Sequence, residues 1–514
     1  MENIKKNVDI VDSRSKKFMY NSITTAIYQV IVMFTGFVTP KIMLDCYGSE
    51  INGLVSSITQ FISYFNLVEA GLAGASIYAL YKPIAENNHK EISGIISASK
   101  KFYTQAGNIF SILLICLALI YPMFISVEDI SVKLIPLLVL ILGVKGTLEF
   151  YTLAKYRVLL TADQKTYVIS IASIVYTILN MIIVAIMSYL KVNVILVYLV
   201  SIVAILARTF ILMFYVRKNY SYINYNAKPN TKALNKRWDA LFLQILGAVQ
   251  NGSPVVIATF ALSLIEVSIF SIYNMVLTGI NGVLSIFNSG LSSSFGDIIA
   301  RNERDTLQKS FKEFEYFYYI IITIIYSISM VMIMPFINIY TNSITDVNYN
   351  QPIIGMLIIL NGFLYNLKTP QGMIVISAGH YKETKNQTMI QAIILIVSSL
   401  LLVNKLGISG ILIGSCLSNL YRDIDLMFYV PNKITKLSWK ISRNRMLWST
   451  ITFIFISYII MKFINVEVYS YFAWILASVK VSIICTILTL ISAMLFDRNQ
   501  FKLVIKRIIN MVKN

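Results

Sequence analysis

The stretch Arg208-Thr209-Phe210-Ile211-Leu212-Met213-Phe214-Tyr215-Val216 recurs in part as Arg422-Asp423-Ile424-Asp425-Leu426-Met427-Phe428-Tyr429-Val430, about 215 residues later. One short match in so apolar a chain could be accidental. It indicates a duplication only if neighbouring segments repeat at nearly the same offset. They do: Ile84-Ala85 matches Ile299-Ala300, Phe102-Tyr103 matches Phe317-Tyr318, and Ala162 matches Ala378. These matches indicate a duplicated unit of about 215 residues.

The composition is that of a chain embedded in a membrane. Hydrophobic residues make up 57% of the sequence and charged residues 13%, and the mean hydropathy is +0.69. A helix needs about 20 apolar residues to cross a bilayer. Stretches of this kind occupy 18–43, 51–82, 102–125, 131–158, 166–189, 192–216, 239–263, 267–299, 314–340, 352–379, 388–404, 407–430, 446–465 and 471–496. We therefore predict an all-α integral membrane protein with about fourteen transmembrane helices.

The repeat arranges these spans as two copies of six followed by a final pair. We predict an N-terminal six-helix lobe at 1–216, a basic linker at 217–238, a C-terminal six-helix lobe at 239–430, two additional helices at 431–496, and a basic amphipathic tail at 497–514. Since each copy has an even number of spans, both enter the membrane from the same side and the repeat is parallel. This geometry predicts a binding cleft between two bundles, as in alternating-access transporters.

The net charge of +19 is explained by membrane topology rather than by a nucleic-acid partner. Lys and Arg concentrate in the amino terminus, in every second loop and in the tail, whereas the loop at 341–351 has no basic residue. The positive-inside rule then places both termini in the cytoplasm of a multi-pass cell-membrane protein. The tail is expected to lie on the inner leaflet, attracted by anionic membrane lipids.

Two of the predicted spans carry polar stripes. Their residues step by three or four, which places them on one face of a helix: Asn52, Ser56, Thr59, Ser63 and Asn66 in one span, and Asn274, Thr278, Asn281, Ser285, Asn288 and Ser292 in its repeat partner. Two further spans add amides: Asn21 in the first span, and Gln250 and Asn251 in the seventh. The stripes favour a wetted cleft that binds substrate. Hydrogen bonding between helices is the alternative use of such residues.

Ionisable groups deep in a bilayer are costly, so each is a candidate for substrate binding. Lys145 and Glu149 lie one turn apart in the same span, where they could partly neutralise each other. Glu69 and Lys368 lie in the middle of two other spans. Because cations outnumber carboxylates in the full set of buried candidates, we expect a cationic cleft and an anionic cargo, such as a phosphate or carboxylate group.

Arg208 and Arg422 lie near the inner ends of their spans and are the least secure candidates. Arginine at that depth can extend to the lipid headgroups, and Asp423 or Asp425 could pair with Arg422. Substrate binding and anchoring therefore both remain open for these arginines.

Several short motifs carry a family resemblance. They are Pro40-Lys41-x-x-Leu44-x-x-x-Gly48, Asn52-Gly53-Leu54, Glu69-Ala70-Gly71-Leu72, Ala378-Gly379-His380-Tyr381-Lys382-Glu383-Thr384 and Lys405-Leu406-Gly407-Ile408-x-Gly410. Over essentially its whole length the chain resembles Wzx-like polysaccharide and oligosaccharide flippases of the multidrug/oligosaccharidyl-lipid/polysaccharide exporter superfamily.

The resemblance implies two bundles around a V-shaped central cleft, lined by the first, second, seventh and eighth spans. It implies that the chain flips a polyprenyl-diphosphate-linked oligosaccharide, a polysaccharide repeat unit of the cell envelope, from the inner to the outer leaflet. Polysaccharide polymerase or export machinery would then be its partners. No single Arg or Lys is carried over from the family.

Two alternatives stay open. A multidrug or cation antiporter of the same superfamily needs a carboxylate in the amino-terminal bundle, where only Glu69 and Glu149 could serve. A polytopic glycan polymerase would carry a large outer loop, but the predicted outer loops are short and no catalytic motif is present. We therefore expect a transporter rather than an enzyme, with no cofactor, driven by a H⁺ or Na⁺ gradient or by the membrane potential.

Overall fold

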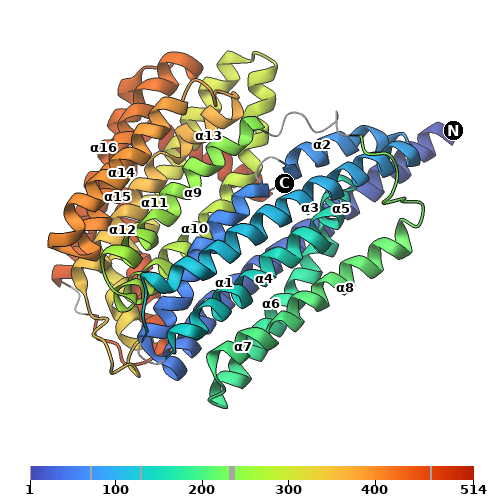
Figure 1. The fold of residues 1–514 in the computed structure, drawn as a ribbon. Helices are drawn as coiled ribbons and strands as arrows, with labels where there is room; N and C mark the ends of the chain where they lie inside the picture. The colour runs from blue at the N-terminus through green and yellow to red at the C-terminus, as the bar shows by residue number, and fades with distance from the viewer. Residues whose placement is uncertain (1, 70–71, 128–129, 231–237, 464–465, 514) are drawn as a thin grey trace. The chain divides into compact units, whose positions relative to one another are not determined.

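The computed structural model describes residues 2–69, 72–127, 130–230, 238–463 and 466–513. Within these, side chains are not described at 2–16, 18, 238–243, 286–293 and 507–513. The chain forms two compact units, Met1–Ala248 and Val249–Asn514, and every regular element in the described ranges is helical. Figure 1 shows that the long helices of each unit run alongside one another.

Unit 1 begins with α1 (Glu2–Phe65), whose 64 residues are two helices that meet at Gly48. Gly48 has φ 79° and ψ 178°, a conformation that glycine adopts without steric cost. A straight helix of this length would extend about 96 Å, roughly three times the hydrocarbon core of about 30 Å. The bend at Gly48 therefore separates the predicted spans 18–43 and 51–82.

The prediction of one continuous helix over 51–82 is wrong. The second arm of α1 ends at Phe65, the 3₁₀ turn η1 (Asn66–Glu69) follows, and α2 (Leu72–Ala85) begins a new helix. Glu69 consequently lies at a helix break and not in mid-helix. Such a break at membrane depth leaves backbone groups that neighbouring protein must cover, and Tyr103 of α3 lies against it.

The rest of unit 1 packs around α1, with α6 against α1 and α8, and with α3 against α4. The helices are α3 (His89–Ile120), α4 (Ile135–Leu148), α5 (Ala154–Ala162), α6 (Thr166–Tyr189), α7 (Val194–Val200) and α8 (Ile202–Asn219), with the 3₁₀ turns η2 (Tyr121–Met123) and η3 (Val132–Leu134). Between α4 and α5 lies the π-helical turn η4 (Glu149–Leu153). Turns of this type often mark functional sites, and this one begins at a predicted site residue.

Unit 2 is built around α11, α14 and α15. Its helices are α10 (Leu264–Ala300), α11 (Arg304–Tyr340), α12 (Pro352–Leu367), α13 (Thr369–Ser377), α14 (Lys385–Leu406), α15 (Ile408–Val430), α16 (Trp439–Phe463), α17 (Tyr471–Phe496) and α18 (Arg498–Lys513), with the π-helical turn η6 (Pro431–Thr435). The boundary between the units falls inside α9 (Trp238–Ala261). α16 and α17 cover α11 through an apolar cluster that includes Met332, Ile456 and Cys485.

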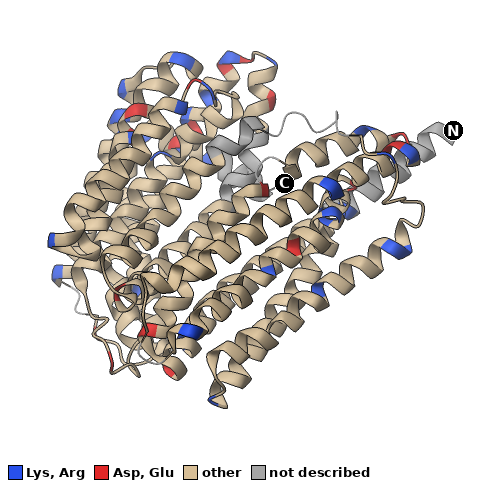
Figure 2. Ribbon diagram, in the orientation of Figure 1, with Lys and Arg blue, Asp and Glu red and all other residues tan. Residues whose placement is uncertain are grey.

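Eleven helices in the described ranges are long and apolar enough to cross a membrane, which identifies a multi-pass membrane protein. One of these runs, Met19–Ala85, contains two of the predicted spans. The predicted spans 239–263 and 407–430 correspond to α9 and α15, which are not among the eleven. The number fourteen stays a prediction. Figure 2 shows that charged residues gather toward the helix ends.

Candidate functional site

A polar cavity of about 460 Å³ lies inside unit 2. The stripe predicted on the eighth span forms one wall through Asn274, Thr278, Asn281 and Ser285 of α10, and Gln250 and Asn251 of α9 lie beside it. The Nε2 atom of Gln250 is buried without a hydrogen-bond partner. Among the described residues that line the cavity, none is charged. The cavity therefore offers amide and hydroxyl groups to a ligand, and no formal charge.

Another part of the lining is a hydrogen-bond network centred on Asn366 of α12, which is 2% exposed. Its Nδ2 donates to Asn281 Oδ1 at 2.9 Å, to the Tyr326 hydroxyl at 2.7 Å and to Gly362 O at 3.0 Å. Its Oδ1 accepts from the Tyr318 hydroxyl at 2.9 Å. The network fixes α12 against α10 and α11, so that the α10 stripe is held in one orientation.

The close approach of these helices requires glycine at position 362. A Cβ atom added there would lie 2.2 Å from Leu277 Cδ1 and 2.8 Å from the Tyr326 ring. Real Cβ atoms do not come this close to their neighbours, because interiors are packed to van der Waals contact. Gly362 thus positions the amide network one turn before Asn366.

Lys368 lies behind the cavity wall, at the break between α12 and α13. Pro370 follows two residues later, and proline cannot continue the hydrogen bonding of a preceding helix. Lys368 Nζ donates to Asn419 Oδ1 at 2.5 Å, and Asn419 Nδ2 donates to Asn361 Oδ1 at 2.9 Å. Since Asn419 and Asn361 both line the cavity, the lysine charge is connected to it through two amides.

Asp423 is a buried carboxylate whose charge acts on Lys368. Neither of its oxygens has a hydrogen-bond partner. The neighbouring Arg422 is 8% exposed in its side chain and pairs with Asp425 at 2.5 Å. Asp425 is thus the partner of Arg422, and it is one of the two acids that the sequence offers for this pairing.

In unit 1 the predicted pairing of Lys145 with Glu149 is wrong. Lys145 Nζ donates to Asn180 Oδ1 of α6 at 3.0 Å and lies 5.7 Å from the centre of the Tyr198 ring. Glu149 instead pairs with Arg157 and, at 3.7 Å, with Arg208. The π-helical turn that starts at Glu149 brings Arg157, two turns along the chain, to the carboxylate.

These pairs belong to a charged cluster inside unit 1. Glu69 Oε1 accepts from the Tyr103 hydroxyl at 3.3 Å, and the charge of Arg157 also acts on Glu69. Arg208 is 12% exposed in its side chain, and its guanidinium lies 5.8 Å from the centre of the Tyr176 ring. Arg208 therefore contacts protein groups within its own unit.

The remaining predicted residues lie in different places. Asn66 and Asn251 are exposed, Asn251 at the cavity, and the side chain of Asn288 lies outside the described residues. The amide of Asn21 bridges α1 and α6: Nδ2 donates to Gln164 O and Oδ1 accepts from Tyr167 N, both at 2.8 Å. Asn21 thus satisfies a free N–H of the first turn of α6.

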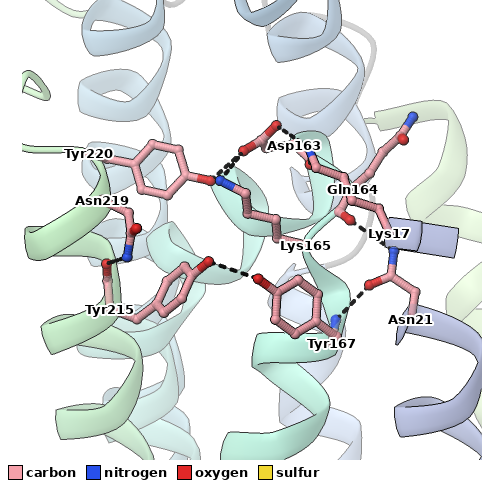
Figure 3. A network of polar contacts seen from close by, with 9 residues as sticks. All are labelled: Lys17, Asn21, Asp163, Gln164, Lys165, Tyr167, Tyr215, Asn219 and Tyr220. Carbon is pink, nitrogen blue, oxygen red and sulfur yellow. Dashed lines mark hydrogen bonds and ion pairs between the residues drawn. The ribbon is translucent and has the colours of Figure 1, made fainter. Parts of the chain in front are cut away.

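Figure 3 shows that Asn21 belongs to a larger polar network at one end of unit 1. Asp163 accepts from the Tyr220 hydroxyl at 2.5 Å and pairs with Lys165 at 2.9 Å and with Lys17 at 3.4 Å. Burial alone would raise the pKa of Asp163, but these hydrogen bonds and positive charges outweigh it and hold the pKa below its ordinary value of 3.8. The network ties α1 and α8 to the loop between α5 and α6.

Asn361, Asn366 and Asn419 were not predicted as site residues. Each is an amide in an apolar span, but none belongs to a periodic stripe. A single amide in a predicted helix gives no indication of its direction, so only the contacts between helices identify these residues.

No family model matches the sequence, and no curated protein matches it. Solved structures do match. An inward-facing multidrug resistance MATE family transporter of the MOP superfamily has a TM-score of 0.66 at 12% identity, over 84% of this chain and 99% of that one. The lipid II flippase MurJ in an inward closed conformation has a TM-score of 0.58 at 16% identity, over 94% and 99%.

MATE in the bent conformation has a TM-score of 0.54 at 12% identity, over 86% of this chain and 97% of that one. At such low identities the likeness concerns the fold, and membership of the Wzx-like family stays a prediction. The chain has the fold of MATE transporters and of the flippase MurJ.

Proposed function

We propose that this chain is a membrane flippase that moves a polyprenyl-diphosphate-linked oligosaccharide from the inner to the outer leaflet by alternating access. The parallel lobes 1–216 and 239–430, the cytoplasmic termini and a cationic cleft between the lobes are parts of this proposal. The fold shared with the lipid II flippase MurJ supports a cargo that is attached to a lipid.

The observation that carries the proposal is the uncharged polar cavity of unit 2. Sugars present many hydroxyl groups, each of which donates and accepts hydrogen bonds, and amide side chains can do both. The volume of about 460 Å³ lies within the range of about 300–1,000 Å³ that is typical of small-ligand sites. In this proposal the cavity holds a sugar of the cargo, with Asn274, Asn281 and Gln250 as ligands.

The cationic residues have a separate role in the proposal. Lys145 and Lys368 are both held by a neutral amide, Asn180 or Asn419, and neither forms an ion pair in the described part of the chain. Both are cations at membrane depth, and the charge of the buried Asp423 also acts on Lys368. Such charges would stabilise a diphosphate as it crosses.

A multidrug or cation antiporter is the second candidate function. It is favoured by the MATE structures and by the carboxylates of Glu69 and Glu149 inside unit 1. A cationic drug needs such a carboxylate in its site. Because the described lining of the unit 2 cavity has no acid, this cavity itself favours a neutral, hydroxyl-rich ligand.

Deletion of the gene followed by leaflet-specific labelling of lipid-linked sugar separates the two functions. We expect lipid-linked sugar to accumulate on the cytoplasmic face of the membrane, and the wild-type gene to restore export. Unchanged glycan together with greater sensitivity to cationic dyes would refute the flippase and support the antiporter. An Asn274→Ala/Asn281→Ala double variant should fail to restore export although it reaches the membrane.

A further inference from the structure

Three basic residues meet at one end of unit 1 without a counter-charge. They are Lys100 of α3, Lys155 of α5 and Arg217 near the end of α8. The helix α5 packs against both α3 and α8, and the charges of Lys100 and Arg217 both act on Lys155. In the part of the chain that the structure describes, no carboxylate forms an ion pair with any of them. Figure 2 shows basic positions gathered on this end of the unit.

Aromatic rings hold the central lysine in place. Lys155 Nζ lies 5.1 Å from the centre of the Tyr156 ring and 5.5 Å from that of Tyr225, and the two rings meet edge to face at 6.3 Å. Such rings attract a cation without neutralising it. Burial and Tyr156 raise the pKa of Tyr225 to about 12, so its hydroxyl keeps its proton and can donate a hydrogen bond to an anion.

The segment that carries Tyr225 is fastened to α3 by three hydrogen bonds. Asn224 N donates to Ser93 Oγ at 3.1 Å, Ser97 Oγ donates to Ala227 O at 2.7 Å, and Asn230 N donates to Gly94 O at 3.1 Å. The basic cluster and its aromatic wall are therefore built before any ligand arrives, which lowers the entropy cost of binding.

Lys100 and Arg217 lie at the boundary of apolar spans, and Lys155 lies inside the span Val132–Ala162. Lys100 directly precedes the apolar part of α3, which starts near Phe102, and Arg217 directly follows the last apolar residues of α8. Lys155 lies about 10 Å along α5 from its end at Ala162. A membrane-bound anion at this end of the unit would hold its headgroup at the level of the cluster.

The repeat offset of 215 residues at Phe102–Tyr103 carries Lys100 onto Glu315, and the offset of 216 at Ala162 carries Lys155 onto Gln371. In unit 2 these two side chains touch, with Gln371 Nε2 donating to Glu315 Oε1 at 2.7 Å. Arg445 of α16 completes that site by pairing with Glu315 at 2.9 Å, and Glu315 is 1% exposed. At the position that matches Glu315, unit 1 therefore carries the positive charge of Lys100.

We propose that Lys100, Lys155 and Arg217, with Tyr225, form a binding site for the phosphate group of a membrane lipid. Phosphate suits three convergent cations because it distributes negative charge over several oxygens. Two sources share this chemistry: the headgroup of an anionic phospholipid and the diphosphate of a lipid carrier. The site does not depend on the proposed cargo or on transport.

The test measures lipid binding to the purified full-length protein in phosphatidylcholine nanodiscs, with fluorescent dioctanoyl phosphatidylglycerol as the probe. The Lys100→Gln/Lys155→Gln/Arg217→Gln variant should lose at least about tenfold in affinity, because each charge-assisted contact contributes on the order of 1 kcal/mol or more. The matched control is Lys90→Gln/Lys101→Gln/Lys218→Gln, which removes three exposed positive charges from α3 and α8. It should stay within about twofold of wild type.

Competitors identify the source of the phosphate. Displacement of the probe by inorganic pyrophosphate assigns the site to a diphosphate, and loss of binding in the variant without such displacement assigns it to a phospholipid headgroup. Equal binding of dioctanoyl phosphatidylcholine, or an equal loss in the control variant, would overturn the proposal. If the triple variant does not fold, the exposed Arg217→Gln is compared with Lys218→Gln, and equal affinities of these two would overturn it as well.

Discussion

Replacement of Asn366 by alanine should destabilise unit 2 more than any loss of packing would explain. The side chain is 2% exposed and bonds with Tyr318, Tyr326 and Asn281, all on neighbouring helices. Truncation removes these three bonds. At about 1 kcal/mol for each of the three partners, we expect a loss of roughly 3 kcal/mol in the free energy of unfolding. Measured hydrogen bonds between membrane helices average about 0.6 kcal/mol, which sets a lower bound of roughly 2 kcal/mol.

The measurement is unfolding of the purified protein in mixed micelles by titration with sodium dodecyl sulfate, followed by tryptophan fluorescence. Asn342→Ala, an exposed asparagine in the loop after α11, is the control and should change the free energy by less than about 0.5 kcal/mol. An Asn366→Ala protein within about 0.5 kcal/mol of wild type would refute the reasoning, because the network would then contribute nothing to the packing of α12.

Lys145→Ala and Lys368→Ala should each reduce glycan export at least about tenfold in the leaflet assay while the protein still inserts. If both variants restore export fully, the hypothesis of a cationic cleft is wrong. Gly362→Ala should cost about 1–3 kcal/mol in the same unfolding titration, whereas Gly372→Ala, where a Cβ meets nothing within 4 Å, should cost far less. Asp163 has a pKa below its ordinary value of 3.8, so its contribution to stability is complete above that value and disappears as the pH falls through the lower, folded-state pKa. Thermal unfolding should therefore show Asp163→Asn to be less stable than wild type at pH 7, with the difference shrinking below about pH 4; a difference that is constant with pH would contradict this.

Some features of the unit 2 cavity were predictable from local sequence. The stripe of Asn274, Thr278, Asn281 and Ser285 was predicted because helical geometry alone places residues three and four apart on one face. In the structure this face lines the cavity of unit 2. The cavity lies within one unit, however, and the cleft between lobes stays a prediction.

Partners of the charged residues were not predictable in the same way. Glu149 was expected to meet Lys145, one turn away, but Arg157 and Arg208 occupy its carboxylate. A helix allows several neighbours at similar distance, and the π-helical turn changes the spacing locally. The cation that pairs with Glu149 therefore depends on how α4, α5 and α8 pack.

The sequence by itself determined that this chain lies in a membrane, because the length and apolarity of its spans are set by the thickness of the bilayer and by the cost of burying charge. It also determined which face of α10 is polar, because that follows from the helical repeat. Only the tertiary structure decided that Asn366 and Asn419 line the same cavity, with Lys368 bonded to Asn419. It also decided that the helices of Lys100, Lys155 and Arg217 pack together. Contacts between helices distant in sequence depend on side-chain shape and on close approaches such as the one at Gly362, which no local pattern encodes.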